Sequence, residues 1–171
     1  MILETRQQHW PDEAACETTA RALARQPALR HACLELHGPL GAGKTTFARH
    51  LLRALGVTGR IKSPSYAIVE PHEVPATDGA DPLDDKLGKL DIWHFDFYRF
   101  GDPREWEDAG FRDLFASPGL KLVEWPDKAR GLLPVPDLSL SLLPDTDSDG
   151  RQALWQARTP LGAALLRETL P

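Results

Sequence analysis

The spacing of apolar residues predicts that strands and helices alternate along the chain. The apolar run Ala32–Leu36 ends just before Gly38 and is typical of a buried strand. Beyond a glycine-containing segment, Phe47, Leu51 and Leu55 recur at the spacing of one helix face. The pattern therefore predicts a strand, a glycine-rich loop and a helix in direct succession.

Other segments extend this pattern. Further helices are expected over residues 12–26, from Asp102 to Gly110 and after Thr159, and further strands at Tyr66–Glu70, Leu90–Tyr98 and Leu120–Glu124, with a hairpin formed by residues 138–142 and 152–157. Residues 71–89 are rich in proline, glycine and acidic side chains and are predicted to form a solvated loop. These elements are those of a globular α/β or α+β protein, built as a single domain over residues 1–171.

The overall composition is that of a globular protein. The 171-residue chain is 42% hydrophobic and 26% charged, close to the averages of folded domains, which argues against disorder or a coiled coil. Its net charge of −5 is unevenly spread, because residues 61–171 carry twenty Asp or Glu against twelve Lys or Arg. An acidic second half disfavours a broad nucleic-acid surface, so DNA binding is not expected.

The chain shows no targeting or anchoring pattern. Its first residues lack the basic-then-apolar layout of a signal peptide, and no apolar run approaches the ~18 residues of a membrane span. Cys16 and Cys33 are too few for a disulfide framework and do not have the spacing of a metal site. A cytoplasmic protein without membrane association is expected.

The segment Gly38–Thr45 carries the strongest chemical signal. Its sequence, Gly-Pro-Leu-Gly-Ala-Gly-Lys-Thr, fits the phosphate-binding loop pattern, in which two glycines five positions apart are followed by Lys and Thr. Such a loop wraps backbone N–H groups around phosphates, Lys44 would reach the β- and γ-phosphate oxygens, and Thr45 would hold Mg²⁺. Because a predicted strand precedes it and a predicted helix follows it, the motif indicates a phosphate-loop NTPase rather than a glycine-rich turn with a surface lysine.

The chain contains no asparagine. The Asn-Lys-x-Asp element with which regulatory GTPases recognise guanine therefore cannot occur in it. ATP is the expected nucleotide.

Phosphoryl transfer also needs carboxylates that hold Mg²⁺ and align the attacking oxygen. In the strand Leu90–Tyr98, strict alternation sets His94, Asp96 and Tyr98 on one side and aromatic residues on the other. Asp96 is predicted to organise metal and water, while His94 either supports the site through a hydrogen bond or is purely structural. Glu124 ends an apolar run at the carboxyl edge of the sheet, where α/β proteins bind their ligands.

The segment Ser63–Tyr66 follows the predicted loop and helix, where nucleotide switches often lie. An ordinary turn before a strand fits the same residues equally well.

Four motifs together resemble the TsaE family, also called YjeE, of small bacterial ATPases. They are the segments Leu40–Thr46, Lys62–Tyr66, His94–Arg99 and Val123–Trp125, which occur in the family's order. The resemblance extends from Pro11 to about Leu166. It implies a phosphate-loop ATPase with a three-layer α/β fold and a mixed sheet. Such a protein binds and slowly hydrolyses Mg-ATP and drives the TsaD–TsaB complex, which forms N6-threonylcarbamoyladenosine at position 37 of tRNA.

The resemblance also implies roles for individual residues. Lys44, Asp96 and Glu124 would be catalytic, and Thr45, Glu124 and Asp96 would hold Mg²⁺. The residues expected at the nucleotide are Pro11, Leu40, Gly41, Ala42, Gly43, Lys44, Thr45, Thr46, Ser65 and Arg151. The expected partners are the TsaD and TsaB proteins, with tRNA reached indirectly through their complex.

Two features depart from the family pattern. Ser65 stands where the family usually has Thr, which keeps the hydroxyl but alters its packing. The segment 71–93 is longer than is usual in the family, and its acidic, proline-containing part is expected at the surface, where it could contact a partner.

Two other functions would use the same loop. A small-molecule kinase would need an acceptor pocket and usually an arginine-bearing lid, and residues 99–112 offer Arg99, Arg104 and Arg112 without a clear lid pattern. A nucleotide-gated binding module, in which hydrolysis is incidental, would carry the same motifs.

Overall fold

The structure, a computed structural model, describes residues 1–64, 66–76 and 88–170. In chain order its elements are β1 (Glu4–Trp10), α1 (Glu13–Ala24), η1 (Pro27–His31), β2 (Cys33–His37), α2 (Lys44–Ala54), β3 (Val69–Val74), β4 (Leu90–Asp96), α3 (Pro103–Asp108), α4 (Phe111–Ala116), β5 (Leu120–Glu124), η2 (Pro126–Ala129), β6 (Leu138–Pro144), β7 (Arg151–Ala157) and α5 (Pro160–Thr169).

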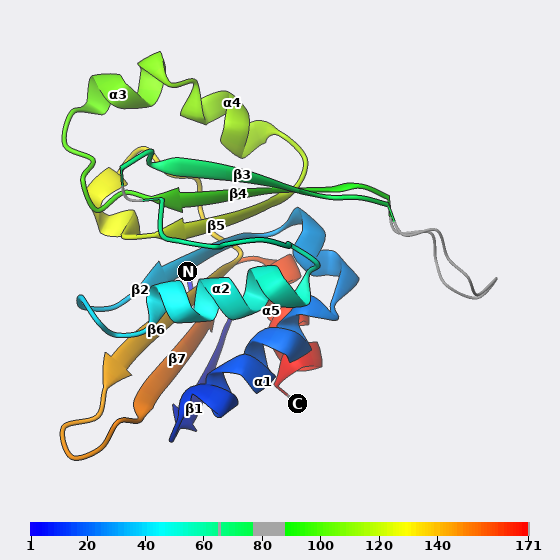
Figure 1. Cartoon of the computed structure of the whole chain (residues 1–171), viewed down its shortest axis with the longest axis vertical. Helices are drawn as coiled ribbons and strands as arrows, with labels where there is room; N and C mark the ends of the chain where they lie inside the picture. The colour runs from blue at the N-terminus through cyan, green and yellow to red at the C-terminus, as the bar shows by residue number, and fades with distance from the viewer. Residues whose placement is uncertain (65, 77–87, 171) are drawn as a thin grey trace.

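The seven strands form a mixed sheet in the order β1-β7-β6-β2-β5-β4-β3 (Figure 1). The four central strands β6, β2, β5 and β4 are parallel to one another. β3 and β7 run antiparallel to these central strands, and β1 pairs antiparallel with β7 at the far edge. Because parallel strands end at the same edge, the carboxyl ends of β2, β4, β5 and β6 lie together, which is where α/β proteins bind ligands.

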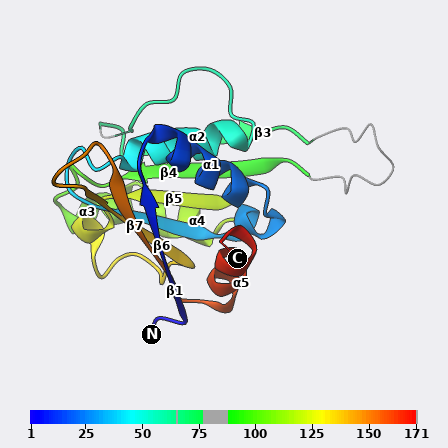
Figure 2. The same cartoon turned by 90° about the horizontal axis from the view of Figure 1, so that it is seen from below.

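Helices cover both faces of the sheet, and each face has its own apolar cluster. On one face α1, α2 and α5 pack around a large cluster that includes Leu34, Phe47 and Leu122. On the other face α3, α4 and η2 enclose a smaller, mainly aromatic cluster that includes Phe95 and Val123. Figure 1 and Figure 2 show α1 and α2 together on one side of β4 and β5. The expected three-layer α/β fold with a mixed sheet is confirmed.

Helix starts follow the capping residues in the sequence. The carboxylate of Asp12 accepts a hydrogen bond from the backbone N–H of Ala15 at 3.0 Å, and Thr159 Oγ1 accepts one from Gly162 at 3.1 Å. These bonds satisfy N–H groups that have no partner within the first helical turn. None of the described helices is long and apolar enough to cross a membrane.

Two elements are not predicted by the apolar pattern. β1 is mostly polar, yet it pairs with β7 along its whole length, from Glu4 opposite Ala157 to Trp10 opposite Arg151. Its strand conformation therefore comes from this long-range pairing and not from local alternation. α4 has only six residues, too few to display a helical period.

The strand expected at Tyr66–Glu70 is shifted along the chain. It spans Val69–Val74, so the first part of the predicted solvated loop belongs to the sheet. Pairing with β4, which sets Val74 opposite Leu90, stabilises this register. Pro71 is tolerated because β3 is an edge strand and needs no ladder donor on its open side. Residues 77–87 of the predicted loop lie outside the described residues.

Candidate functional site

The loop that joins β2 to α2 (residues 38–43) has a backbone that only glycine adopts easily. Gly43, which precedes the first residue of α2, has a φ of 107°, and a side chain at Gly38 would place its Cβ 2.5 Å from the carbonyl oxygen of Leu142. Within residues 1–64, 66–76 and 88–170, no side chain caps the start of α2. The first N–H groups of this helix therefore remain available to an anion, and the helix dipole favours negative charge there.

Lys44 lies folded back over this loop. Its Nζ donates hydrogen bonds to the carbonyl oxygens of Gly38 at 2.5 Å and Pro39 at 2.9 Å, and it lies 4.0 Å from the centre of the Trp125 ring. The residue is only 5% exposed. Burial lowers the pKa of Lys44, and the nearby carboxylate of Glu124 opposes this shift.

Glu124 receives a hydrogen bond on each carboxylate oxygen. Thr45 Oγ1, in the first turn of α2, donates to Oε1 at 2.7 Å, and His94 Nε2, on β4, lies 2.7 Å from Oε2. The side chains of His94 and Glu124 are 0% and 1% exposed. A buried chain of polar groups therefore connects the glycine-rich loop to the ends of two central strands.

Asp96 lies beside Glu124, because β4 and β5 pair these two residues directly. Its Oδ1 accepts a hydrogen bond from the backbone N–H of Tyr98 at 2.9 Å, and its Oδ2 accepts one from the hydroxyl of Ser63. The side of β4 that carries His94 and Asp96 is thus polar but buried, and the chain after α2 is tied to the end of β4.

Trp125 has a strained backbone next to this site. Its φ of 54° and ψ of 49° lie in the left-handed region, which non-glycine residues seldom occupy. Its ring packs against Tyr98, with ring centres 5.0 Å apart, and covers Lys44. The left-handed turn after Glu124 therefore directs the indole over the loop.

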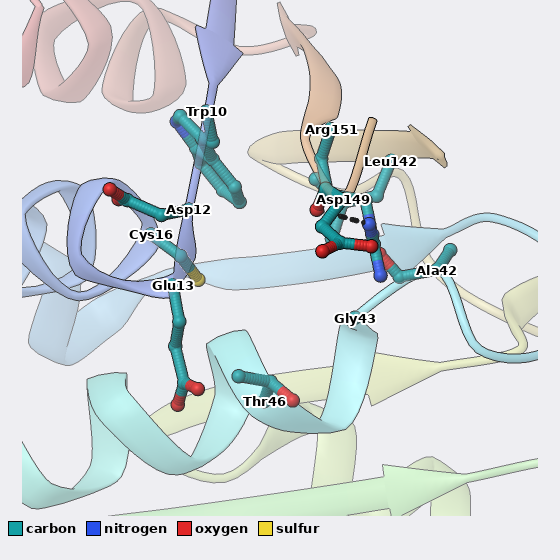
Figure 3. A pocket seen from close by; sticks show the side chains of 10 residues that line it. All are labelled: Trp10, Asp12, Glu13, Cys16, Ala42, Gly43, Thr46, Leu142, Asp149 and Arg151. Carbon is teal, nitrogen blue, oxygen red and sulfur yellow. Dashed lines mark hydrogen bonds between the residues drawn. The ribbon is translucent and has the colours of Figure 1, made fainter. Parts of the chain in front are cut away.

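A pocket of about 150 Å³ lies beside the first turn of α2 (Figure 3). It is lined by Trp10, Asp12, Glu13, Cys16, Ala42, Gly43, Thr46, Leu142, Asp149 and Arg151. Figure 3 shows residues from β1 and α1 facing residues from β6, β7 and the turn between them across the start of α2. Arg151 Nε donates to the carbonyl oxygen of Ala42 at 2.9 Å, so this side chain supports the glycine-rich loop from outside.

The structure brings most of the predicted site residues to one place. Lys44, Thr45, Asp96 and Glu124 surround the start of α2, while Ala42, Gly43, Thr46 and Arg151 line the adjacent pocket. Gly41 lies within reach of Arg151, whose Nη2 is 3.4 Å from its carbonyl oxygen. Pro11 is exposed and lies between two lining residues, and Leu40 is 76% exposed at the loop. Ser65 lies outside the described residues.

Several neighbours of the site have no signal in the sequence. The pocket walls include Trp10, Cys16, Leu142 and Asp149, which come from segments far apart in the chain. The contact between Ser63 and Asp96 likewise depends on how the chain returns to β4. The structure places His94 Nε2 2.7 Å from Glu124 Oε2, a contact that either interpretation of His94 allows.

The donor set suits a magnesium ion bound together with a phosphate. Hydroxyl and carboxylate oxygens, such as those of Thr45 and Glu124, are ligands that Mg²⁺ prefers, and this ion commonly binds one or two carboxylates plus substrate phosphates. Among the described residues, no group of three His, Cys, Asp or Glu side chains is arranged to hold a metal by itself. The residues therefore fit an Mg²⁺ ion whose remaining ligands come from a nucleotide and water.

Relatives of known family match most of the chain. The model of the family described as "Threonylcarbamoyl adenosine biosynthesis protein TsaE" matches residues 10–153. The tRNA threonylcarbamoyladenosine biosynthesis protein TsaE of Haemophilus influenzae is 34% identical over 168 residues, which cover 96% of this chain and 97% of that protein. The protein of the same name from Bacillus subtilis is 38% identical over 101 residues, 59% of this chain and 54% of its own length.

The fold is also similar to that of a solved structure. The crystal structure of YdiB from Bacillus subtilis superposes with a TM-score of 0.73 at 24% sequence identity and covers 99% of this chain and 95% of that one. The likeness of fold, the family match over residues 10–153 and the full-length relative agree with the four motifs in the sequence. The chain belongs to the TsaE family of threonylcarbamoyl adenosine biosynthesis proteins.

Proposed function

We propose that this chain binds and slowly hydrolyses Mg-ATP and thereby drives a TsaD–TsaB complex that forms N6-threonylcarbamoyladenosine at position 37 of tRNA. The observation that carries the proposal is the 2.7 Å hydrogen bond between Thr45 and Glu124, directly behind Lys44 and the uncapped start of α2. This arrangement combines an anion site, a cation for phosphate and two oxygen ligands for Mg²⁺.

Each of these groups has a defined task in the proposed reaction. The N–H groups of the loop and Lys44 bind and orient the phosphates, and Thr45 and Glu124 hold the metal. Bound Mg²⁺ neutralises charge that develops on the phosphate oxygens during transfer. Asp96 would orient the attacking water or a water held by the metal.

Asp96 can perform this role from the position it occupies, because each carboxylate oxygen can accept more than one hydrogen bond. Both of its oxygens accept hydrogen bonds, from Ser63 and from the backbone of Tyr98. Its position opposite Glu124 is suitable, since the two carboxylates come from paired strand ends.

The pocket beside the first turn of α2 is proposed as the site of the adenine base. It adjoins Gly43 and Thr46, and its wall includes the indole of Trp10, which stacks on Phe47 with ring centres 5.9 Å apart. A rigid aromatic wall suits a flat base. We place ATP and not GTP there because the chain lacks the asparagine of the guanine-specific element.

The proposed partners and location are those that the resemblance to the family implies. A cytoplasmic protein that acts with TsaD and TsaB, and reaches tRNA through them, needs a protein-binding surface. The side chain of Leu40, 76% exposed on the glycine-rich loop, places an apolar group where such a partner would sense the nucleotide.

The test is a reconstituted reaction with TsaD, TsaB and tRNA. We expect ATP turnover and repeated tRNA modification with the wild-type chain, and loss of both with Asp96→Ala or Glu124→Ala. Intact turnover and intact repeated modification in both variants would overturn the proposal. A non-hydrolysable ATP analogue that supported many rounds would instead favour gating by binding, and phosphate transfer to a metabolite panel would favour a kinase.

A further inference from the structure

We propose that His94 is a positioning residue that fixes the carboxylate of Glu124, so that Oε1 faces Thr45 and the metal while Oε2 is held away from it. The inference rests on the proposed Mg-ATP site, because it assigns a task to a residue that would touch neither metal nor nucleotide. Its basis is the geometry around the Glu124 carboxylate.

The two oxygens of Glu124 are held from opposite sides. Thr45 Oγ1 lies 2.7 Å from Oε1, and His94 Nε2 lies 2.7 Å from Oε2. His94 is 0% exposed and Glu124 is 1% exposed, so the bond between them is shielded from solvent, whereas Thr45 is half-buried. The carboxylate plane is therefore fixed by two side chains from different elements, α2 and β4.

The other ring nitrogen of His94 defines the direction of the hydrogen bond. Nδ1 is buried and has no hydrogen-bond partner in the part of the chain that the structure describes. A hydrogen on Nδ1 would be a buried donor without an acceptor, which costs free energy. The ring hydrogen therefore lies on Nε2, which donates to the acceptor oxygen of Glu124.

The backbone beneath His94 is rigid. It lies on β4 two residues before Asp96, and β4 pairs His94 with Leu122 on one side and Glu70 on the other. Both neighbouring strands thus hold the backbone from which the ring projects. A side chain on such a strand can fix a carboxylate more closely than one on a loop.

A purely structural histidine would form its hydrogen bonds with backbone groups or with other structural side chains. Here the one hydrogen bond that the ring makes to the described residues goes to the side chain that is proposed to hold the metal. Residues that hydrogen-bond a metal's ligands typically change metal affinity or activity by about 10- to 100-fold when they are replaced. Replacement of His94 should therefore raise the Mg²⁺ concentration that tight nucleotide binding needs, and should leave the binding of metal-free nucleotide unchanged.

The experiment compares three variants of the full chain. His94→Gln keeps an N–H donor near the position of Nε2, His94→Asn places its donor near that of Nδ1, and His94→Leu removes the donor. His72→Gln is the matched control, because His72 lies on β3 on the same sheet face, opposite Ile92, and its buried Nε2 has no hydrogen-bond partner among the described residues. ADP and ATP binding are measured in EDTA and over a range of Mg²⁺ concentrations.

We expect His94→Asn and His94→Leu to require about 10- to 100-fold more Mg²⁺ for tight nucleotide binding. His94→Gln should recover most of the loss, His72→Gln should match the wild type, and binding in EDTA should be the same for all. In the wild type, ¹⁵N NMR should find the hydrogen of His94 on Nε2.

Equal Mg²⁺ dependence in the wild type, His94→Asn and His94→Gln would overturn the positioning role, and so would a hydrogen on Nδ1. If His94→Leu does not fold, the Gln and Asn pair still gives the answer. Absence of Mg²⁺-dependent nucleotide binding in the wild type would instead overturn the proposed function, so the two failures are distinguishable.

Discussion

Thr45 Oγ1 donates a 2.7 Å hydrogen bond to Glu124 Oε1, although the two residues are 79 positions apart in the chain. The bond connects the first turn of α2 to the last residue of β5. Because Glu124 is 1% exposed, the pair is formed inside the protein and not at its surface. A metal bound by Thr45 Oγ1 and Glu124 Oε1 would thus be held by two elements, α2 and β5.

Replacement of Glu124 by Gln should impair magnesium-dependent turnover without impairing the binding of metal-free nucleotide. The amide keeps an oxygen for Thr45 but removes the negative charge that Mg²⁺ needs, so magnesium-dependent ATP turnover should fall by about 10²-fold. ATP affinity in EDTA should change little. Turnover and binding are measured across a magnesium titration.

Glu70→Gln is the matched control for that experiment. It removes the same charge from the same sheet, at an exposed position on β3, and should leave turnover unaltered. A Glu124→Gln protein with wild-type magnesium dependence would contradict the role of this carboxylate.

The sequence predicts the parts of the site that lie within one segment. The loop after β2, the helix that follows it and the strand Leu120–Glu124 can be recognised because apolar spacing, glycines and the Lys-Thr pair are contiguous. Capping by Asp12 and Thr159 is equally local. These features need only the geometry of a helix or a strand.

The remaining features depend on which segments meet. β1 becomes a strand because β7 is available to pair with it, and the pocket forms only where Trp10 and Leu142 face each other. The ring of Trp125 reaches Lys44 because its backbone adopts a left-handed conformation, which no local pattern predicts for tryptophan. Long-range pairing and backbone strain thus account for what the apolar pattern does not predict.

Because the backbone of Trp125 is left-handed, a Gly variant at this position should be more stable than an Ala variant, which is the reverse of the order expected within a helix. The free energy of unfolding of Trp125→Gly should be about 1 kcal/mol higher than that of Trp125→Ala, because only glycine adopts a φ of 54° without a steric penalty. Urea denaturation measures both values.

At Thr18, an exposed residue within α1, the order should be reversed. Thr18→Ala should be the more stable variant by about 1 kcal/mol, because glycine weakens helix interiors. If Trp125→Ala proved as stable as Trp125→Gly, the left-handed conformation would not be the one present in solution.

Gln8 should be needed for the attachment of β1. Its Oε1 accepts hydrogen bonds from the indole N–H groups of Trp10 and Trp155, each at 3.1 Å, and both indoles are buried. Gln8→Leu would leave two donors without this acceptor, so the free energy of unfolding should fall by about 2 kcal/mol. The measurement is urea denaturation followed by tryptophan fluorescence.

Gln7→Leu provides the control, because Gln7 is the neighbouring residue of β1 and is exposed. It should change the free energy of unfolding by less than about 0.5 kcal/mol. An equal loss of unfolding free energy in Gln8→Leu and Gln7→Leu would show that β1 tolerates no apolar replacement. It would contradict a specific role for Gln8 as the shared acceptor.

The thiol of Cys16 should resist ionisation until strongly alkaline pH. Burial raises its pKa from 9.0 to about 12, and the side chain lines the pocket beside α2. Between these two values the unfolded chain loses the thiol proton while the folded chain keeps it. The unfolded state then binds fewer protons, so the free energy of unfolding should decrease as the pH rises above 9.

Alkylation by iodoacetamide, followed by mass spectrometry from pH 7 to 11, tests this pKa through the reactive thiolate. A Cys33→Ala background leaves Cys16 as the single thiol, since the chain has two cysteines. At pH 8 the folded protein should react about 10³-fold more slowly than the same chain in concentrated urea, because a three-unit rise in pKa lowers the thiolate fraction by that factor. A folded-state reactivity with a midpoint near pH 9 would mean that Cys16 is hydrated, and that the pocket extends deeper toward α1 than its lining residues indicate.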